Sequence, residues 1–167
     1  VVEQEEIVAY HLEQAYAYRT QLAPLDDQSR AIGSRAGARL AAAGRRATGR
    51  GDHVAAVNLL RRAAALSEDG GSERARVLYD LGSALVWVGD AQSAFATFEE
   101  AAGVGARAGD RSLERLARLR RSVMVTPTSP HDMPTEVLRA ELEEAARAFE
   151  DIGDEAALST VWTELAP

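Results

Sequence analysis

The feature that most constrains this chain is a Gly-Asp pair that recurs four times between apolar segments, at residues 51–52, 89–90, 109–110 and 153–154. Glycine adopts, without steric cost, the left-handed backbone conformation that closes a helix at its C-terminus. The aspartate that follows accepts hydrogen bonds from the free amides of the next helix and complements its dipole. Each pair therefore predicts the end of one helix and the immediate start of another, antiparallel to the first.

Helical periodicity of apolar residues surrounds these pairs, and no segment alternates with the period of two that strands require. Apolar residues make up 46% of the 167 residues but aromatic residues only 5%, so packing depends on alanine and leucine, which favours helices over a sheet. The three prolines within residues 127–134 predict an irregular connection there. The stop and start signals predict an all-α chain of about eight helices, over residues 3–22, 27–50, 53–67, 74–88, 91–108, 111–125, 135–152 and 155–166.

An offset of 38 residues superimposes the first two Gly-Asp pairs and reveals an internal repeat. Small residues at matching positions let two helices approach closely, so we expect Gly82 and Ala94 to meet at one helix crossing, with Ser93 exposed. Leu60 and Phe98 are expected to fill the groove against the next repeat. The aligned positions are Leu40 with Leu78, Ala43 with Leu81, Gly44 with Gly82, Ala47 with Leu85, Ala56 with Ala94 and Leu60 with Phe98.

This pattern resembles the tetratricopeptide repeat, whose sequence W-x2-L-G-x2-Y…A-x3-F it follows with substitutions. The resemblance implies a single helical-repeat domain over residues 1–167, an α-α superhelix of stacked antiparallel helix pairs with a concave inner surface. The period of 38 rather than 34 and the missing closing proline depart from the family pattern. The expected parts are an N-terminal helix at 1–25, repeats at 26–70 and 71–108, a degenerate repeat at 109–152 and the start of a truncated repeat at 153–167.

A narrower resemblance is carried by the phrases "AYHLEQAYAYRTQL" and "AAGRRATGRGDHVAAVNLLRRAAAL". They look like the helical region that follows the ATPase module in large bacterial signalling proteins. Those proteins couple a class III adenylate or guanylate cyclase domain, or a LuxR-type DNA-binding domain, to a predicted ATPase and tetratricopeptide-like repeats. The resemblance implies a cytoplasmic fragment of a larger signalling protein. Its partner would be a protein segment or another domain of its own full-length chain, with a homodimer as a further assembly to consider.

The residue types present argue against catalysis. The chain has no cysteine, which excludes thiol catalysis, disulfides and zinc-ribbon sites, and no lysine, which excludes a P-loop. His11, His53 and His131 are far apart in the sequence and have no second ligand at helical spacing. Adjacent glutamates such as Glu99 and Glu100 point apart on a helix and read as a solvated face. We therefore expect a protein that is not an enzyme, with no catalytic, cofactor-binding or metal-binding residues.

Charge and hydropathy narrow the classes of partner. The net charge is −7, and the arginine-rich stretch at 106–121 contains no aromatic residue, so an arm that contacts nucleic acid is the least favoured alternative. The apolar runs are shorter than the roughly 20 residues of a membrane span, so no membrane partner is expected. A regulatory repeat domain that senses a small ligand remains the main alternative to a protein-binding module.

The register of the repeat identifies the candidate protein-binding residues on the concave face. Arg45 and Arg76 favour an acidic partner on grounds of charge. Trp87 is either an anchor for that partner or a cover over the neighbouring helix turn. In the first repeat, the equivalent positions hold small side chains and one arginine, and therefore form a nearly smooth surface: Ala38, Ala41, Arg45, Thr48 and Gly49. The six candidate residues are Arg45, Arg76, Tyr79, Ser83, Val86 and Trp87.

Overall fold

The computed structural model describes residues 2–22, 24–67, 71–125 and 135–165, and these residues form helices and their connections without a strand. The all-α fold predicted from the Gly-Asp pairs is therefore confirmed for the described part of the chain. Its eight helices are α1 (Val2–Leu22), α2 (Asp27–Gly49), α3 (His53–Leu66), α4 (Ser72–Trp87), α5 (Ala91–Ala108), α6 (Arg111–Val125), α7 (Thr135–Ile152) and α8 (Glu155–Leu165).

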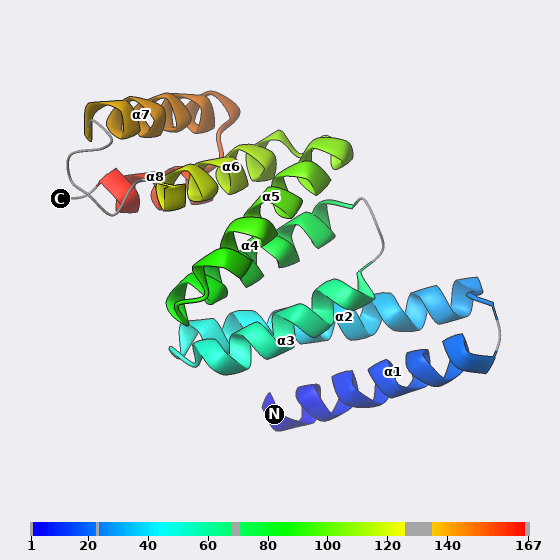
Figure 1. The fold of residues 1–167 in the computed structure, drawn as a ribbon. Helices are drawn as coiled ribbons and strands as arrows, with labels where there is room; N and C mark the ends of the chain where they lie inside the picture. Colours follow the sequence, from blue (N-terminus) through cyan, green and yellow to red (C-terminus); the bar gives the residue numbers. More distant parts are fainter. Residues whose placement is uncertain (1, 23, 68–70, 126–134, 166–167) are drawn as a thin grey trace.

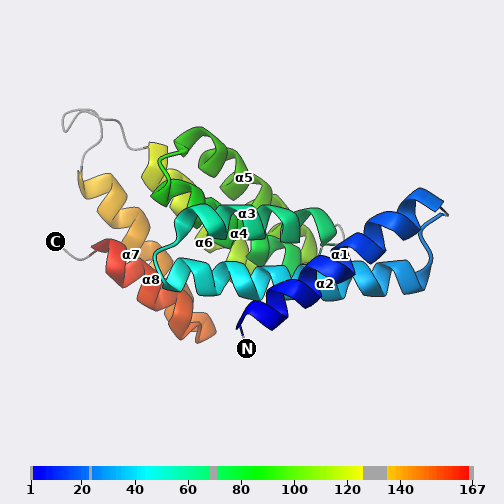
Figure 2. The same ribbon diagram turned by 90° about the horizontal axis from the view of Figure 1, so that it is seen from below.

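The helices stack in chain order, each against the one before it, with α1 and α7 at opposite ends of the stack (Figure 1). The closest pairs are α2 with α3 and α4 with α5, and α7 packs against α8. Contacts also join α2 to α4 and α4 to α6, so alternate helices share one side of the stack. Seen from below, the α7–α8 hairpin runs at a steep angle to α2 and α3 (Figure 2). This is the arrangement of a helical-repeat fold.

The four Gly-Asp turns share one hydrogen-bond pattern. All four glycines have φ between 69° and 80°, the left-handed conformation that the sequence predicts. In the first turn, the amide of Asp52 donates to the carbonyl of Ala47 at 2.9 Å, and the other three turns repeat this bond at 2.9–3.0 Å. Each aspartate side chain then accepts from the amide three residues further on, at 3.0–3.1 Å. Each turn therefore satisfies backbone groups of both helices that it joins.

Within each pair, a large apolar side chain lies over a glycine of the preceding helix. A Cβ atom placed on Gly82 would lie 2.8 Å from the ring of Phe98, and one on Gly44 would lie 2.6 Å from Leu60. The repeat pattern predicts that Gly82 meets Ala94, and the atoms nearest to a Cβ on Gly82 belong to Phe98, one helical turn beyond Ala94. Leu60 holds the same place over Gly44. Both large side chains are fully buried, so the glycines make room for the core of each pair.

The structure differs from the sequence prediction at one position on α5. Ser93 is half-buried rather than exposed, because its position faces partly inward on α5.

The first helix, α1, packs on α2 through Tyr16, whose ring lies where a Cβ of Gly33 would be. In addition, Glu13 of α1 forms a salt bridge with Arg62 of α3. The α1 helix thus occupies the place that a second helix of a preceding repeat would take.

The glycine beneath Phe98 generates a stability prediction. Gly82→Ala should lower the free energy of unfolding by about 1–3 kcal/mol, because the added methyl group overpacks against a buried ring. This loss is expected even though alanine favours the helix by about 1 kcal/mol over glycine. Urea denaturation followed by circular dichroism measures the change.

The matched control is Gly103→Ala on α5, where the nearest atom to an added Cβ is the Arg107 guanidinium, at 3.5 Å. With room for the methyl group, this substitution should stabilise the protein by about 0.5–1 kcal/mol. Equal stabilisation by both substitutions would show that Phe98 does not constrain Gly82.

Candidate interaction groove

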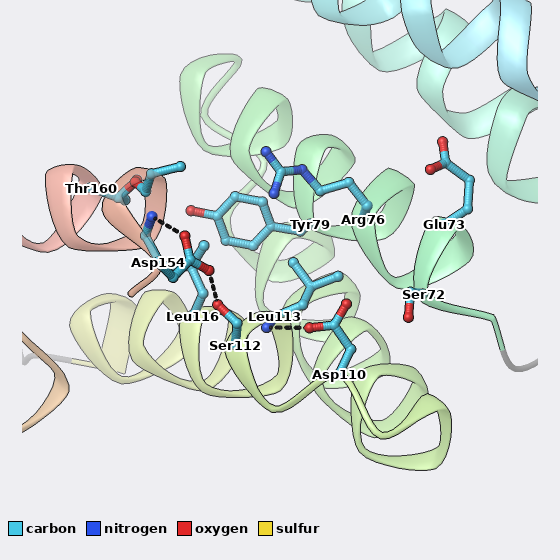
Figure 3. A pocket seen from close by; sticks show the side chains of 12 residues that line it. Ser72, Glu73, Arg76, Tyr79, Asp110, Ser112, Leu113, Leu116, Asp154 and Thr160 are labelled. Carbon is cyan, nitrogen blue, oxygen red and sulfur yellow. Dashed lines mark hydrogen bonds between the residues drawn. The ribbon is translucent and has the colours of Figure 1, made fainter. Parts of the chain in front are cut away.

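A cavity of about 310 Å³ opens between α4, α6 and α8, and we call it the inner groove (Figure 3). The first turns of all three helices contribute to its wall, and two of these helices, α6 and α8, begin at Gly-Asp turns. Its floor combines apolar and polar side chains from segments far apart in the sequence. The lining residues are Ser72, Glu73, Arg76, Tyr79, Asp110, Ser112, Leu113, Leu116, Asp154, Ala156, Ala157 and Thr160.

Asp154 connects two walls of the inner groove. Its Oδ1 accepts from the backbone amide of Ala157 at 3.0 Å, which caps α8, and its Oδ2 accepts from the hydroxyl of Ser112 on α6. The Ser112 hydroxyl, together with the Ala157 amide, lowers the pKa of the Asp154 carboxyl below its ordinary value. Asp154 is therefore ionised at neutral pH, and its carboxylate holds α8 against α6.

Tyr79 forms the α4 side of the inner groove. Its side chain is 9% exposed and lies against Phe98, with ring centroids 5.7 Å apart. Figure 3 shows its hydroxyl directed toward the side of the groove formed by Asp154 and Thr160. Burial raises the pKa of the Tyr79 hydroxyl, so this group stays neutral at physiological pH. The groove thus has a neutral aromatic wall with a polar end.

Beside the inner groove, Asp80 pairs with arginines from two helices. Arg45 Nη1 on α2 lies 3.1 Å from Asp80 Oδ2, and Arg76 Nε on α4 lies 3.7 Å from Oδ1. The Asp80 side chain is only 16% exposed. Burial raises the pKa of its carboxyl above the ordinary value, against the opposing effect of its hydrogen bond from Arg45. Sequence reasoning did not identify Asp80, although its i, i+4 spacing from Arg76 was the available signal.

The six predicted concave-face residues separate into distinct positions. Arg76 and Tyr79 line the inner groove, whereas Arg45 lies outside its lining and bridges α2 to α4 through Asp80. Ser83 is half-buried, and its hydroxyl donates to the carbonyl of Tyr79 at 3.0 Å. Val86 is exposed at the end of α4, beyond the groove lining.

Trp87, the sixth residue, stacks on His53 at the start of α3, with ring centroids 5.1 Å apart and an interplanar angle of 7°. The Trp87 side chain is nevertheless 68% exposed. It is not among the residues that line the inner groove. Of the two interpretations of Trp87, this stack matches the one in which the ring covers a neighbouring helix turn.

Among the described residues, no group of three or more histidine, aspartate or glutamate side chains is placed to hold a metal ion. His131 and the proline-rich connection lie outside the described residues. No helix in the described part of the chain is long and apolar enough to cross a membrane.

The raised pKa of Asp80 predicts how stability depends on pH. The folded protein binds a proton at Asp80 more readily than the unfolded chain does, so the buried charge reduces stability at pH values above the folded-state pKa. Asp80→Asn should therefore be more stable than the native protein at neutral pH. The difference should shrink as pH falls through that pKa, when urea denaturation is compared at several pH values.

Asp151→Asn, which removes an exposed carboxylate from α7, is the control and should change stability by less than about 0.5 kcal/mol. If Asp80→Asn is instead less stable at neutral pH, with a gap that widens as pH rises, the arginines outweigh the effect of burial.

Comparison of the chain with protein-family models, with curated proteins and with solved structures finds no match.

Proposed function

We propose that this chain is a non-catalytic helical-repeat module whose inner groove binds a segment of a protein partner. The observation that carries this proposal is the position of the groove, on the side that α4 and α6 share and that α8 extends. Stacked repeats present such a surface because each helix pair buries its apolar face against its neighbours and leaves the inner side open. Arg76 and Tyr79, two residues that the repeat register assigns to partner binding, line this groove.

The side chains that line the groove are better suited to binding a peptide than to catalysing a reaction. Tyr79, Leu113 and Leu116 supply aromatic and apolar surface, and Arg76 and Thr160 supply hydrogen-bonding groups. Protein interfaces are enriched in tyrosine and arginine, with a polar rim around an apolar centre. The aspartates of the groove act as helix caps, which gives them a structural role that needs no substrate.

The resemblance to signalling proteins suggests where the partner segment comes from. In such proteins the repeats follow an ATPase module, so we propose another domain of the same full-length chain as the first partner to test. A segment of a separate protein would use the same surface. The cyclase or DNA-binding activity of such proteins would then reside outside this chain, and the module would control how those domains are arranged.

The test uses a random peptide library displayed on phage and selected on the whole chain. Ala156 is exposed and lines the inner groove, so Ala156→Trp should fill the cavity. We expect this substitution to weaken the selected peptides by at least about tenfold, or about 1.4 kcal/mol, in fluorescence anisotropy titrations. Ala106→Trp, which adds the same ring to an exposed position on α5, is the control and should leave binding within about twofold.

A further variant, Trp87→Ala, distinguishes binding in the inner groove from binding at the end of α4. Trp87→Ala should leave the same peptides bound as tightly as before, because Trp87 lies outside the lining of the groove and stacks on His53. If the selected peptides bind Ala156→Trp as well as they bind the native chain, the inner groove is not the binding surface. A loss with Trp87→Ala but not with Ala156→Trp would move the site to the end of α4.

A further inference from the structure

The charges around the inner groove are unbalanced. Its lining includes three carboxylates, Glu73 on α4, Asp110 before α6 and Asp154 before α8, but a single cationic side chain, Arg76. The three carboxylates come from three different segments of the chain and line one cavity, with the Glu73 carboxylate at its edge, directed away from Asp110 and Asp154 (Figure 3). An excess of carboxylates on the wall of a cavity attracts cationic groups, because low-dielectric walls strengthen the local field.

The arginines near the groove do not reverse this excess. Arg76 lies 3.7 Å from Asp80, and Arg45 contacts the same carboxylate at 3.1 Å, with a second approach to Glu73 at 3.9 Å. Both arginines therefore already face carboxylates of the chain itself. This pairing weighs against the acidic partner that the sequence suggested from Arg45 and Arg76.

The Asp154 carboxylate keeps its charge at neutral pH. The Ser112 hydroxyl and the Ala157 amide lower the pKa of Asp154. The Glu73 side chain is 65% exposed, so water solvates it. Asp110 accepts a hydrogen bond from the amide of Leu113 at 3.0 Å, as Asp154 does from that of Ala157, so these two amides are not free donors for an anion.

We propose that the partner segment is basic, and that an arginine or lysine side chain of that segment enters the inner groove beside Asp110 and Asp154, with Glu73 at the α4 edge of the groove. Its apolar stem lies along Tyr79 and Leu116, and its charged end meets the carboxylates. This inference rests on the proposed function and adds to it the chemistry of the partner. The chain's net charge of −7 acts in the same direction, since it steers basic segments toward the module.

The test removes charge while keeping the helix caps. Asparagine caps a helix about as well as aspartate, so Asp110→Asn and Asp154→Asn keep the helix caps, and Asp110→Asn also leaves the bond between Ser112 and Asp154 unchanged. The peptides used are those whose binding to the chain is lost in the Ala156→Trp variant. For these peptides, Asp110→Asn, Asp154→Asn and Glu73→Gln should each weaken the affinity by about threefold to tenfold. Arg76→Gln keeps a hydrogen-bonding side chain in the groove but should strengthen binding, because it removes the positive charge that repels a basic peptide.

Matched controls isolate the groove from the overall charge. Asp90→Asn removes one charge from an identical cap between α4 and α5, and Glu150→Gln removes one from the exposed face of α7. Both should leave affinity within about twofold. Replacing the arginine or lysine residues of the peptide by glutamine should abolish its dependence on Glu73, and added sodium chloride should weaken the native complex.

The outcomes separate this inference from the proposed function. If groove-dependent peptides lack basic residues, or bind Asp110→Asn and Asp154→Asn as tightly as the native chain, the basic partner is wrong while the module function stands. Acidic peptides that bind more tightly to these variants would assign the groove to an acidic segment instead. If no selected peptide depends on the groove, the proposed function fails, and this inference fails with it.

Discussion

The contact between Phe98 and Gly82 underlies both the fold and the candidate site. A side chain at position 82 would collide with the ring, so the absence of one lets α5 pack closely on α4. Phe98 in turn supports Tyr79 from beneath, with ring centroids 5.7 Å apart. Since Tyr79 forms a wall of the inner groove, a close helix contact in the core supports the shape of that wall.

Polar interactions then tie neighbouring pairs together on the inner side. Asp80 bridges α4 to Arg45 of α2, and Asp154 bridges α8 to Ser112 of α6. The two carboxylates have opposite effects on the stability of the fold at neutral pH, because burial raises the pKa of Asp80 whereas hydrogen bonds lower that of Asp154. Asp80 therefore holds two arginines in place at a cost in stability at neutral pH, and Asp154 strengthens the joint that it makes.

The inner groove depends on repetition of the same turn. Asp110 and Asp154 are both second residues of Gly-Asp turns, and both face one cavity because α6 and α8 lie on the same side of the stack. The Gly-Asp turn, which supplies hydrogen bonds to the backbone groups at helix ends, thus also supplies two of the carboxylates on which binding of the proposed basic partner depends. Stability and binding share these residues, so substitutions that test binding must conserve the cap, as asparagine does.

The sequence by itself determined the helices, their turns and part of the site. The left-handed glycines and the aspartate caps follow from interactions between residues a few positions apart, and the predicted helix bounds agree with the observed ones to within two residues. The internal repeat also identified Arg76 and Tyr79 as residues of the inner side, because equivalent positions on stacked helices face the same way.

Only the tertiary structure decided what those residues meet. Asp154 lies 42 residues from its partner Ser112, and Arg45 lies 35 residues from Asp80. The stack of Trp87 on His53, the burial of Asp80 and the negative charge of the groove depend on how successive pairs rotate against each other. That rotation is the sum of many side-chain contacts between pairs, such as Phe98 over Gly82, and no local pattern in the sequence specifies it.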